Sequence, residues 1–209
     1  MIRVLLVDDH GVVREGFRAV LECDPDVKVV AEAASGEEGY GLYFRHHPDV
    51  VVLDIALKGE NGLSTLRRLL NRDPEARVLM FSMYDDELLA IRALEMGARG
   101  YLTKSSPPEM LGKAVRAIAR GEDFLEDELA RRMALRRVST PRGLNALTAR
   151  EFEVFQMLAE GKTVREIADT LHLSEKTVGS HRTRVMEKLD CRNVAQLARL
   201  AIRHGLMSP

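Results

Sequence analysis

The chain has 209 residues, with 31 lysines and arginines against 32 aspartates and glutamates, for a net charge of −1. This length allows one large domain or two of ordinary size, and the balanced charge does not by itself indicate a nucleic-acid partner. Cys23 and Cys191 lie far apart without ligand-like spacing, so we expect reduced thiols and neither a disulfide nor a zinc site. The apolar run at the start is too short for a signal peptide or a membrane span, which indicates a soluble, cytoplasmic protein.

The first 120 residues alternate between β-branched apolar runs and helical patterns. Predicted strands cover residues 2–7, 27–33, 50–53, 78–81 and 100–103. The helix predicted after each strand covers residues 12–23, 35–45, 63–70, 87–96 and 106–120. Ser35 and Ser106 each stand three residues before a glutamate, as in a capping box, and Asp85 is placed to cap the fourth helix. Five strand–helix repeats predict an α/β domain over residues 1–120 with a five-stranded, doubly wound parallel sheet.

Polar side chains stand at the carboxyl ends of four predicted strands: Asp8 and Asp9, Asp54, Ser82 and Lys104. These ends meet at one edge of a parallel sheet, where α/β proteins place their chemistry. Three carboxylates in one pocket repel each other, so a hard divalent cation such as Mg²⁺ is the natural counter-charge. An aspartate can attack phosphorus and carry an acyl phosphate, while a lysine and a hydroxyl bind other phosphoryl oxygens. The pattern therefore predicts a phosphoacceptor site centred on Asp54.

Taken singly, each of these residues has an ordinary structural explanation. Asp8 and Asp9 could be a helix cap and its solvated neighbour, and Lys104 could simply be exposed. Asp54 could cap the next turn, and Ser82 could satisfy the end of its strand. The conjunction favours a site, because all five residues fall at the carboxyl ends of predicted strands.

Four short segments carry a resemblance to a known family: Val7-Asp8-Asp9-His10, Leu53-Asp54-Ile55 followed by Gly59 and Gly62, Phe81-Ser82-Met83-Tyr84, and Gly100-Tyr101-Leu102-Thr103-Lys104. With them, residues 1–120 resemble the receiver domain of two-component response regulators, which have a flavodoxin-like fold. The resemblance implies that Asp54 is the phosphoacceptor and that Asp9 and Asp54 bind Mg²⁺ directly. It further implies that Asp8 binds Mg²⁺ through water and that the backbone carbonyl of Ala56 is another ligand.

The resemblance also implies that Ser82 and Tyr101 form a switch pair, in which the hydroxyl moves onto the phosphoryl group and the ring turns inward. The sequence departs from the family at Leu57 and Lys58, where Met-Pro is common, and at Met83, where many receivers have a small residue. A carbonyl ligand does not depend on its own side chain, so we expect metal binding to survive the first departure.

Residues 121–143 predict a linker that contains a short amphipathic helix, because Leu125, Leu129 and Met133 recur at helical spacing. A flexible Ser-Thr-Pro-Arg-Gly piece follows at residues 139–143. The arginines of this linker either contact DNA phosphate or pair with nearby acids on a solvated helix face.

Residues 144–209 predict a small all-α domain of four helices, over about residues 148–161, 163–171, 174–189 and 193–204. Thr148 and Thr163 each begin a capping box, and Ser174 and Asn193 cap the last two helices. The tight turn at residues 172–174 makes a helix-turn-helix.

On the helix at residues 174–189, helical periodicity places Val178 and Val185 on a face that points toward a core. The opposite face has short polar side chains, with basic residues along its edges. A recognition helix for the DNA major groove needs that arrangement, and an ordinary surface helix also shows it.

Further motifs sharpen this interpretation: Leu147-Thr148-Ala149-Arg150-Glu151, Ala159-Glu160-Gly161, Glu166-Ile167-Ala168, Thr177-Val178, His181 and Lys188-Leu189. Over residues 147–198 the chain resembles the LuxR-type helix-turn-helix of the NarL/FixJ subfamily. The resemblance implies DNA contacts by Lys176, Thr177, Gly179, Ser180, Arg182, Thr183, Arg184 and Lys188. It also implies that the helix at 193–204 helps to form a dimer, although core packing is the better explanation of its apolar residues. Many relatives have lysine in place of Gly179, so the target sequence cannot be taken from them, and Ser180 and Thr183 are left to read bases.

We interpret the chain as a response regulator transcription factor and not as an enzyme. The expected partners are a sensor histidine kinase, promoter half-sites in double-stranded DNA and, after phosphorylation, a second copy of the chain. Mg²⁺ is the expected cofactor, and no membrane partner is expected. One alternative is a metal-dependent phosphohydrolase with Asp54 as nucleophile and Asp8 or Asp9 as acid/base, which leaves the helical domain unexplained. The other is a DNA-binding protein whose receiver is never phosphorylated and serves only for dimerisation.

Overall fold

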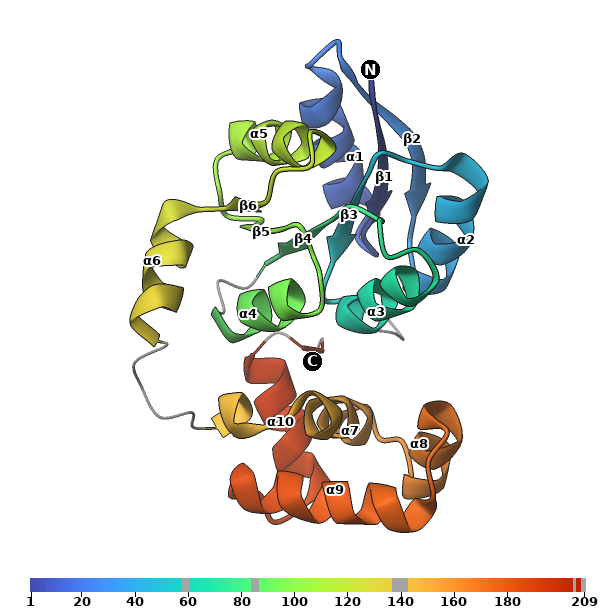
Figure 1. Cartoon of the computed structure of the whole chain (residues 1–209), viewed down its shortest axis with the longest axis vertical. Helices are drawn as coiled ribbons and strands as arrows, with labels where there is room; N and C mark the ends of the chain where they lie inside the picture. Colours follow the sequence, from blue (N-terminus) through green and yellow to red (C-terminus); the bar gives the residue numbers. More distant parts are fainter. Residues whose placement is uncertain (58–60, 84–86, 137–142, 205, 208–209) are drawn as a thin grey trace. The chain divides into compact units, whose positions relative to one another are not determined.

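The structure is a computed structural model that describes residues 1–57, 61–83, 87–136, 143–204 and 206–207. The chain divides into two compact units, Met1–Arg137 and Val138–Pro209, which Figure 1 shows in one view. Some expectations lie outside the described residues: Asp85 as a helix cap, Lys58 and Gly59 after the third strand, and most of the Ser-Thr-Pro-Arg-Gly piece. Within the described ranges, no helix is long and apolar enough to span a membrane.

The first unit is built on one parallel sheet with the strand order β2-β1-β3-β4-β5-β6. The strands are β1 (Ile2–Val7), β2 (Val27–Ala33), β3 (Val50–Asp54), β4 (Val78–Ser82), β5 (Gly100–Thr103) and β6 (Phe124–Leu125). Strands β3 and β4 are buried along their whole length, which explains their unbroken apolar runs. The parallel α/β architecture is confirmed, but the prediction of five strands is wrong, because the sheet has a sixth.

Strand β6 lies beside β5 because the chain turns back immediately after α5 (Pro108–Ala119). Gly121 adopts a φ of +85°, and its amide donates to the carbonyl oxygen of Ile118 at 2.9 Å. Phe124 then pairs with Gly100, where an added Cβ would lie 2.6 Å from the Phe124 carbonyl oxygen. Glycine at position 100 therefore makes room for the sixth strand.

Helices cover both faces of the sheet (Figure 1). Helices α1 (Gly11–Glu22) and α5 lie on one face, and α2 (Gly36–His46), α3 (Gly62–Arg72) and α4 (Glu87–Glu95) lie on the other. The linker helix is α6 (Asp127–Arg136), which packs against α4. Between the sheet and the first pair of helices lies an apolar core that includes Leu6, Val52, Phe81, Leu111 and Val115.

Where the structure describes the expected cap residue, the helix starts follow the predicted caps with one exception. The Ser35 hydroxyl accepts from the Glu38 amide at 3.2 Å, as predicted. The capping box expected from Ser106 to Glu109 is not formed: the N-cap of α5 is Pro107, and the Ser106 hydroxyl contacts the Thr103 hydroxyl at 2.7 Å. Ser106 therefore stands one residue too early to reach the free amides of the first turn.

The second unit is helical, as predicted. It contains a short 3₁₀ helix η1 (Gly143–Ala146), then α7 (Ala149–Ala159), α8 (Val164–Leu171), α9 (Glu175–Lys188) and α10 (Val194–Arg203). Both predicted capping boxes are present, at the starts of α7 and α8. Between α8 and α9, His172 has a φ of +53°, which closes the tight turn of the helix-turn-helix. Its core is filled by residues that α7, α9 and α10 bury completely: Phe155, Val178, Val185 and Leu197.

Candidate functional site

Three of the predicted site residues meet at the carboxyl edge of the sheet. Asp54 ends β3, Asp8 follows β1 and Lys104 follows β5. The Nζ atom of Lys104 lies 2.7 Å from Asp54 Oδ2 and 2.6 Å from Asp8 Oδ2. The exposed fractions of the three side chains are only 2% for Lys104, 7% for Asp8 and 3% for Asp54. One buried ammonium group thus bridges two buried carboxylates and offsets part of their negative charge.

Backbone groups orient this cluster. The second oxygen of Asp8 accepts from the His10 amide at 2.8 Å, and the second oxygen of Asp54 accepts from the Ala56 amide at 3.2 Å. The Lys104 amide donates to the carbonyl oxygen of Ser82 at 2.7 Å, which ties the ends of β4 and β5 together. Backbone amides just after the strand ends therefore orient the two carboxylates.

Gly62, the first residue of α3, is required by the close approach of this helix to β3. A Cβ at this position would lie 1.9 Å from the Asp54 carbonyl oxygen. The Gly62 amide also donates to the Ile55 carbonyl oxygen at 2.8 Å. The start of α3 is thus fixed directly against the backbone of the candidate phosphoacceptor.

Asp9 and His10 complete an acidic cluster with Asp8 and Asp54. One possible ligand atom from each of the four side chains lies within 4.8 Å of the others. Carboxylate oxygens are the donors that hard cations such as Mg²⁺ take in proteins, so the three aspartates fit this ion. His10 was not among the predicted site residues, although its Nδ1 lies 2.7 Å from Asp9 Oδ1. Its position after Asp9 was visible in the sequence, but the direction of its side chain was not.

Burial dominates the electrostatics of Asp54. It raises the pKa of the Asp54 carboxyl above its ordinary value, and the neighbouring Asp8 adds to this effect. The ammonium group and hydrogen bond of Lys104 oppose the rise without cancelling it. A carboxylate that is costly to keep ionised in this pocket gains from any cation that enters it.

Ser82 and Tyr101 lie on the neighbouring strands β4 and β5, and both are fully buried. Ser82 is the register partner of Thr103, and Tyr101 is paired with Met80 on one side and with Leu125 of β6 on the other. Met83, the next residue after Ser82, is 66% exposed. The Tyr101 ring is therefore inside the protein in this structure, while the bulky Met83 side chain faces solvent.

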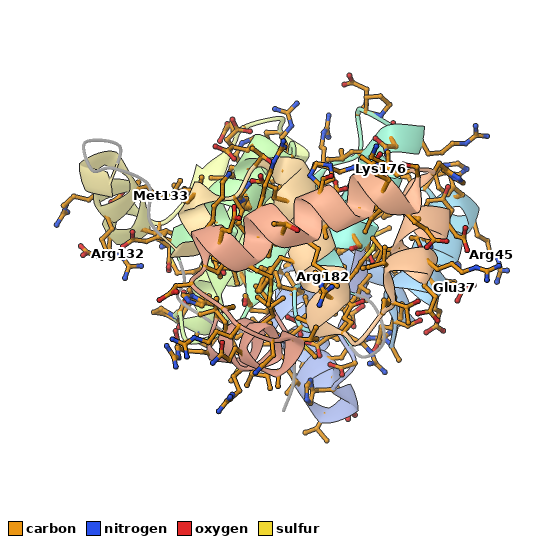
Figure 2. The ribbon with its side chains drawn as sticks, turned by 90° about the horizontal axis from the view of Figure 1, so that it is seen from below. Glu37, Arg45, Arg132, Met133, Lys176 and Arg182 are labelled. Carbon is orange, nitrogen blue, oxygen red and sulfur yellow. The ribbon has the colours of Figure 1, made fainter. Side chains whose placement is uncertain are left out.

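Most of the predicted DNA-contacting residues lie on the outer side of α9, whereas the Lys188 side chain contacts Glu151 of α7. Val178 and Val185 are buried, whereas the predicted contact residues other than half-buried Gly179 are exposed: Lys176, Thr177, Ser180, Arg182, Thr183, Arg184 and Lys188. Figure 2 shows Lys176 and Arg182 near opposite edges of α9. Cations at the edges and short side chains between them form a surface suited to phosphates on either side of a groove.

Both units match known families. Residues 4–116 match the family described as "Response regulator receiver domain", and residues 145–201 match "Bacterial regulatory proteins, luxR family". The chain is also 35% identical to the response regulator UvrY of Escherichia coli K12 over 209 residues, covering 99% of this chain and 96% of UvrY. The chain is a response regulator of the NarL/FixJ family.

Other relatives span its whole length as well. LiaR, a transcriptional regulatory protein of Bacillus subtilis, is 36% identical over 211 residues and matches along all of both chains. Among solved structures, RcsB of Salmonella enterica serovar Typhimurium, bound to the promoter rprA with the phosphomimetic BeF₃⁻, has a TM-score of 0.74 at 25% identity. That match covers 95% of this response regulator and 96% of the RcsB chain. The family consists of transcription factors, so the predicted function class is confirmed and the phosphohydrolase alternative is set aside.

Lys188 of this response regulator is engaged inside the second unit. Its ammonium group donates to Glu151 Oε2 at 2.6 Å and to the Ala146 carbonyl oxygen at 2.9 Å. Burial alone would raise the pKa of Glu151, whose side chain is 3% exposed, but the bonds from Lys188 and Thr148 outweigh it and hold the pKa below the ordinary value. The pair joins the end of α9 to the start of α7, a role that sequence reasoning missed because the partners are far apart in the chain.

Two hydroxyls on the outer side of α9 are bonded to their own helix. The Ser180 hydroxyl donates to the Lys176 carbonyl oxygen at 3.0 Å, and the Thr183 hydroxyl donates to the Gly179 carbonyl oxygen at 3.1 Å. Both oxygens keep lone pairs that can accept a hydrogen bond from outside, and the Thr183 methyl group is available for apolar contact.

Proposed function

We propose that Asp54 accepts a phosphoryl group from a sensor histidine kinase and that phosphorylation controls DNA binding by the second unit. The juxtaposition of Lys104 with Asp54 and Asp8 carries this proposal. An Asp54 oxygen attacks the phosphorus of a phosphohistidine, the P–N bond breaks, and its electron pair stays on the imidazole nitrogen. The Asp54 carboxylate becomes an acyl phosphate in this step.

The residues around Asp54 position and neutralise the transferred group. Lys104 lies within hydrogen-bonding distance of Asp54, so its ammonium group can pass to a phosphoryl oxygen as charge moves there. The Ser82 hydroxyl donates to another phosphoryl oxygen. A shift of Ser82 on β4 displaces the neighbouring strand β5, which carries Tyr101. We assign Ser82 and Tyr101 as the switch pair on this basis.

Asp8, Asp9, Asp54 and the backbone carbonyl of Ala56 would hold Mg²⁺. The three carboxylates supply oxygen ligands for this ion. When bound, Mg²⁺ offsets the repulsion among these carboxylates and the phosphoryl oxygens. The surrounding residues keep the carboxylates away from bulk water. The backbone amides of His10 and Ala56 orient the carboxylates of Asp8 and Asp54.

The second unit would bind promoter DNA through α9. Lys176, Arg182 and Arg184 meet phosphates, while Thr177, Gly179, Ser180 and Thr183 face base edges. Lys188 can reach DNA only at the expense of its bonds to Glu151 and Ala146. A phosphorylated homodimer, formed with the help of α10, presents two α9 helices to half-sites about one DNA turn apart. We place this activity in the cytoplasm, where kinase and promoter are both accessible.

The test is to measure gel-filtration mobility and affinity for DNA selected from a random double-stranded pool, with and without acetyl phosphate and Mg²⁺. We expect phosphodonor and Mg²⁺ together to promote dimerisation and tighten DNA binding, and the Asp54→Asn variant to show neither response. Asp26→Asn is the matched control, since Asp26 is exposed and precedes β2 at the opposite edge of the sheet. Unchanged mobility and affinity in the wild type would refute the switching role.

A further inference from the structure

The strand β5 joins the candidate phosphoacceptor site directly to the linker. Lys104, which contacts Asp54, follows the last residue of β5, and Tyr101 within the same strand is the register partner of Leu125 in β6. The Phe124 amide donates to the Arg99 carbonyl oxygen at 2.8 Å, so main-chain bonds hold β6 in place. A shift of β5 at the site therefore acts on β6 without any intervening element.

The next element, α6, is docked on the receiver. Leu129 of α6 is only 2% exposed, and α6 packs against α4. An ion pair between the two helices, with Arg132 Nε 3.6 Å from Glu87 Oε1, lies beside this contact. Figure 2 shows where Arg132 and Met133 project from α6. Among the side chains of α6 that the structure describes, buried Leu129 and the Arg132–Glu87 pair thus mark the face turned to the receiver.

The chain that follows α6 is short. Residues 137–142 alone separate α6 from η1, and six residues reach at most roughly 20 Å when fully extended. Where α6 lies on the receiver therefore limits where the DNA-binding unit can go.

From these contacts we infer that β6 and α6 form a coupling element, in which the docking of α6 on α4 through Leu129 and the Arg132–Glu87 pair makes DNA binding depend on the state of the receiver. This inference rests on the proposed function. It adds that the contact between α6 and α4 transmits the state of the receiver to the DNA-binding unit. Leu129 and Arg132 are positioning residues and take no part in phosphoryl transfer.

The test compares DNA affinity of the full-length protein before and after phosphorylation, while mass spectrometry records phosphoryl incorporation. We expect Arg132→Glu to reduce the ratio of the two affinities about two- to five-fold, the range for loss of a surface ion pair. Leu129→Asp, which puts a charge on the docked face, is expected to bring the ratio close to one. Both variants should accept the phosphoryl group as the wild type does.

The controls use the charges of the same elements. Arg131→Glu changes a neighbouring arginine that pairs with Glu128 of its own helix, both 69% exposed, and should leave the affinity ratio unchanged. The double variant Glu87→Arg with Arg132→Glu should restore the ratio. The inference would be overturned if Arg132→Glu and Leu129→Asp kept the wild-type ratio of DNA affinities, or if the charge exchange failed to restore that ratio. Neither result would affect the proposed function. A wild type whose affinity ignores phosphorylation would refute the proposed function itself.

Discussion

The contact between Lys188 and Glu151 leads to a prediction that separates stability from DNA binding. The perturbation is Lys188→Met, which keeps the aliphatic stem and removes the ammonium group. The substitution removes the bonds to Glu151 Oε2 and to the Ala146 carbonyl oxygen. It leaves a carboxylate with a 3% exposed side chain that still accepts from the Thr148 amide at 2.8 Å.

The magnitude follows from these contacts. A hydrogen bond to a charged group contributes about 1.5–3 kcal/mol, and two such bonds are lost. Because the Lys188 side chain is 35% exposed, water can replace part of the loss. We expect the second unit to be destabilised by about 2 kcal/mol, which corresponds to a fall of roughly 10 °C in Tm for a unit of this size.

The assay is calorimetry of the full-length protein, with hydrogen exchange to locate the change in α7 and α9. Lys176→Met is the matched control, because Lys176 is exposed on α9. It should change stability by less than about 0.5 kcal/mol but lower the salt dependence of DNA binding by about one unit of slope. Lys188→Met should leave that slope unchanged. A stable Lys188→Met variant with a reduced salt slope would refute the structural role and support a phosphate contact instead.

Three further predictions concern Asp54 and two glycines. Burial raises the pKa of Asp54, so the Asp54 carboxyl binds a proton more tightly in the folded receiver than in the unfolded chain, and the ionised residue lowers stability at neutral pH. This loss of stability disappears as the pH falls. Urea unfolding in EDTA should therefore show the Asp54→Asn variant more stable than the wild type at pH 7, with a difference that shrinks towards pH 4. Gly62→Ala should destabilise the receiver by about 3 kcal/mol or more in the same urea unfolding assay, because the added Cβ would lie 1.9 Å from the Asp54 carbonyl oxygen. A smaller loss of stability would show that α3 can shift away from β3. Gly179→Ala should stabilise the second unit by about 1 kcal/mol, because an added Cβ meets no atom within 4 Å and alanine favours the helix. The same substitution should change the affinity for DNA, and an unchanged affinity would show that Gly179 is not part of the DNA interface.

Much of the receiver could be predicted because its signals are local. The β-branched runs of β3 and β4 are buried on both faces, and polar residues such as Asp54 and Lys104 mark where strands end. Parallel topology then brings these ends together whatever their separation in sequence. The convergence of Asp8, Asp54 and Lys104 follows from that rule.

The parts that were missed depend on tertiary contacts. Strand β6 has two residues, too few for any periodicity, and exists because Gly100 leaves room beside β5. Leu125 and Leu129 fit a single helical stripe in the sequence, but in the structure Leu125 belongs to β6 and Leu129 to α6. Likewise, no local pattern connects Lys188 to Glu151, because only the packing of α9 on α7 brings them together.

The most direct measurement of the central claim is to locate the phosphoryl group on the chain. The full-length protein is treated with acetyl phosphate and Mg²⁺, reduced with borohydride to trap an acyl phosphate, digested and analysed by mass spectrometry. The account predicts that the trapped product lies at Asp54 and that the Asp54→Asn variant gives none. A modified residue elsewhere, or equal labelling of the Asp54→Asn variant, would contradict it.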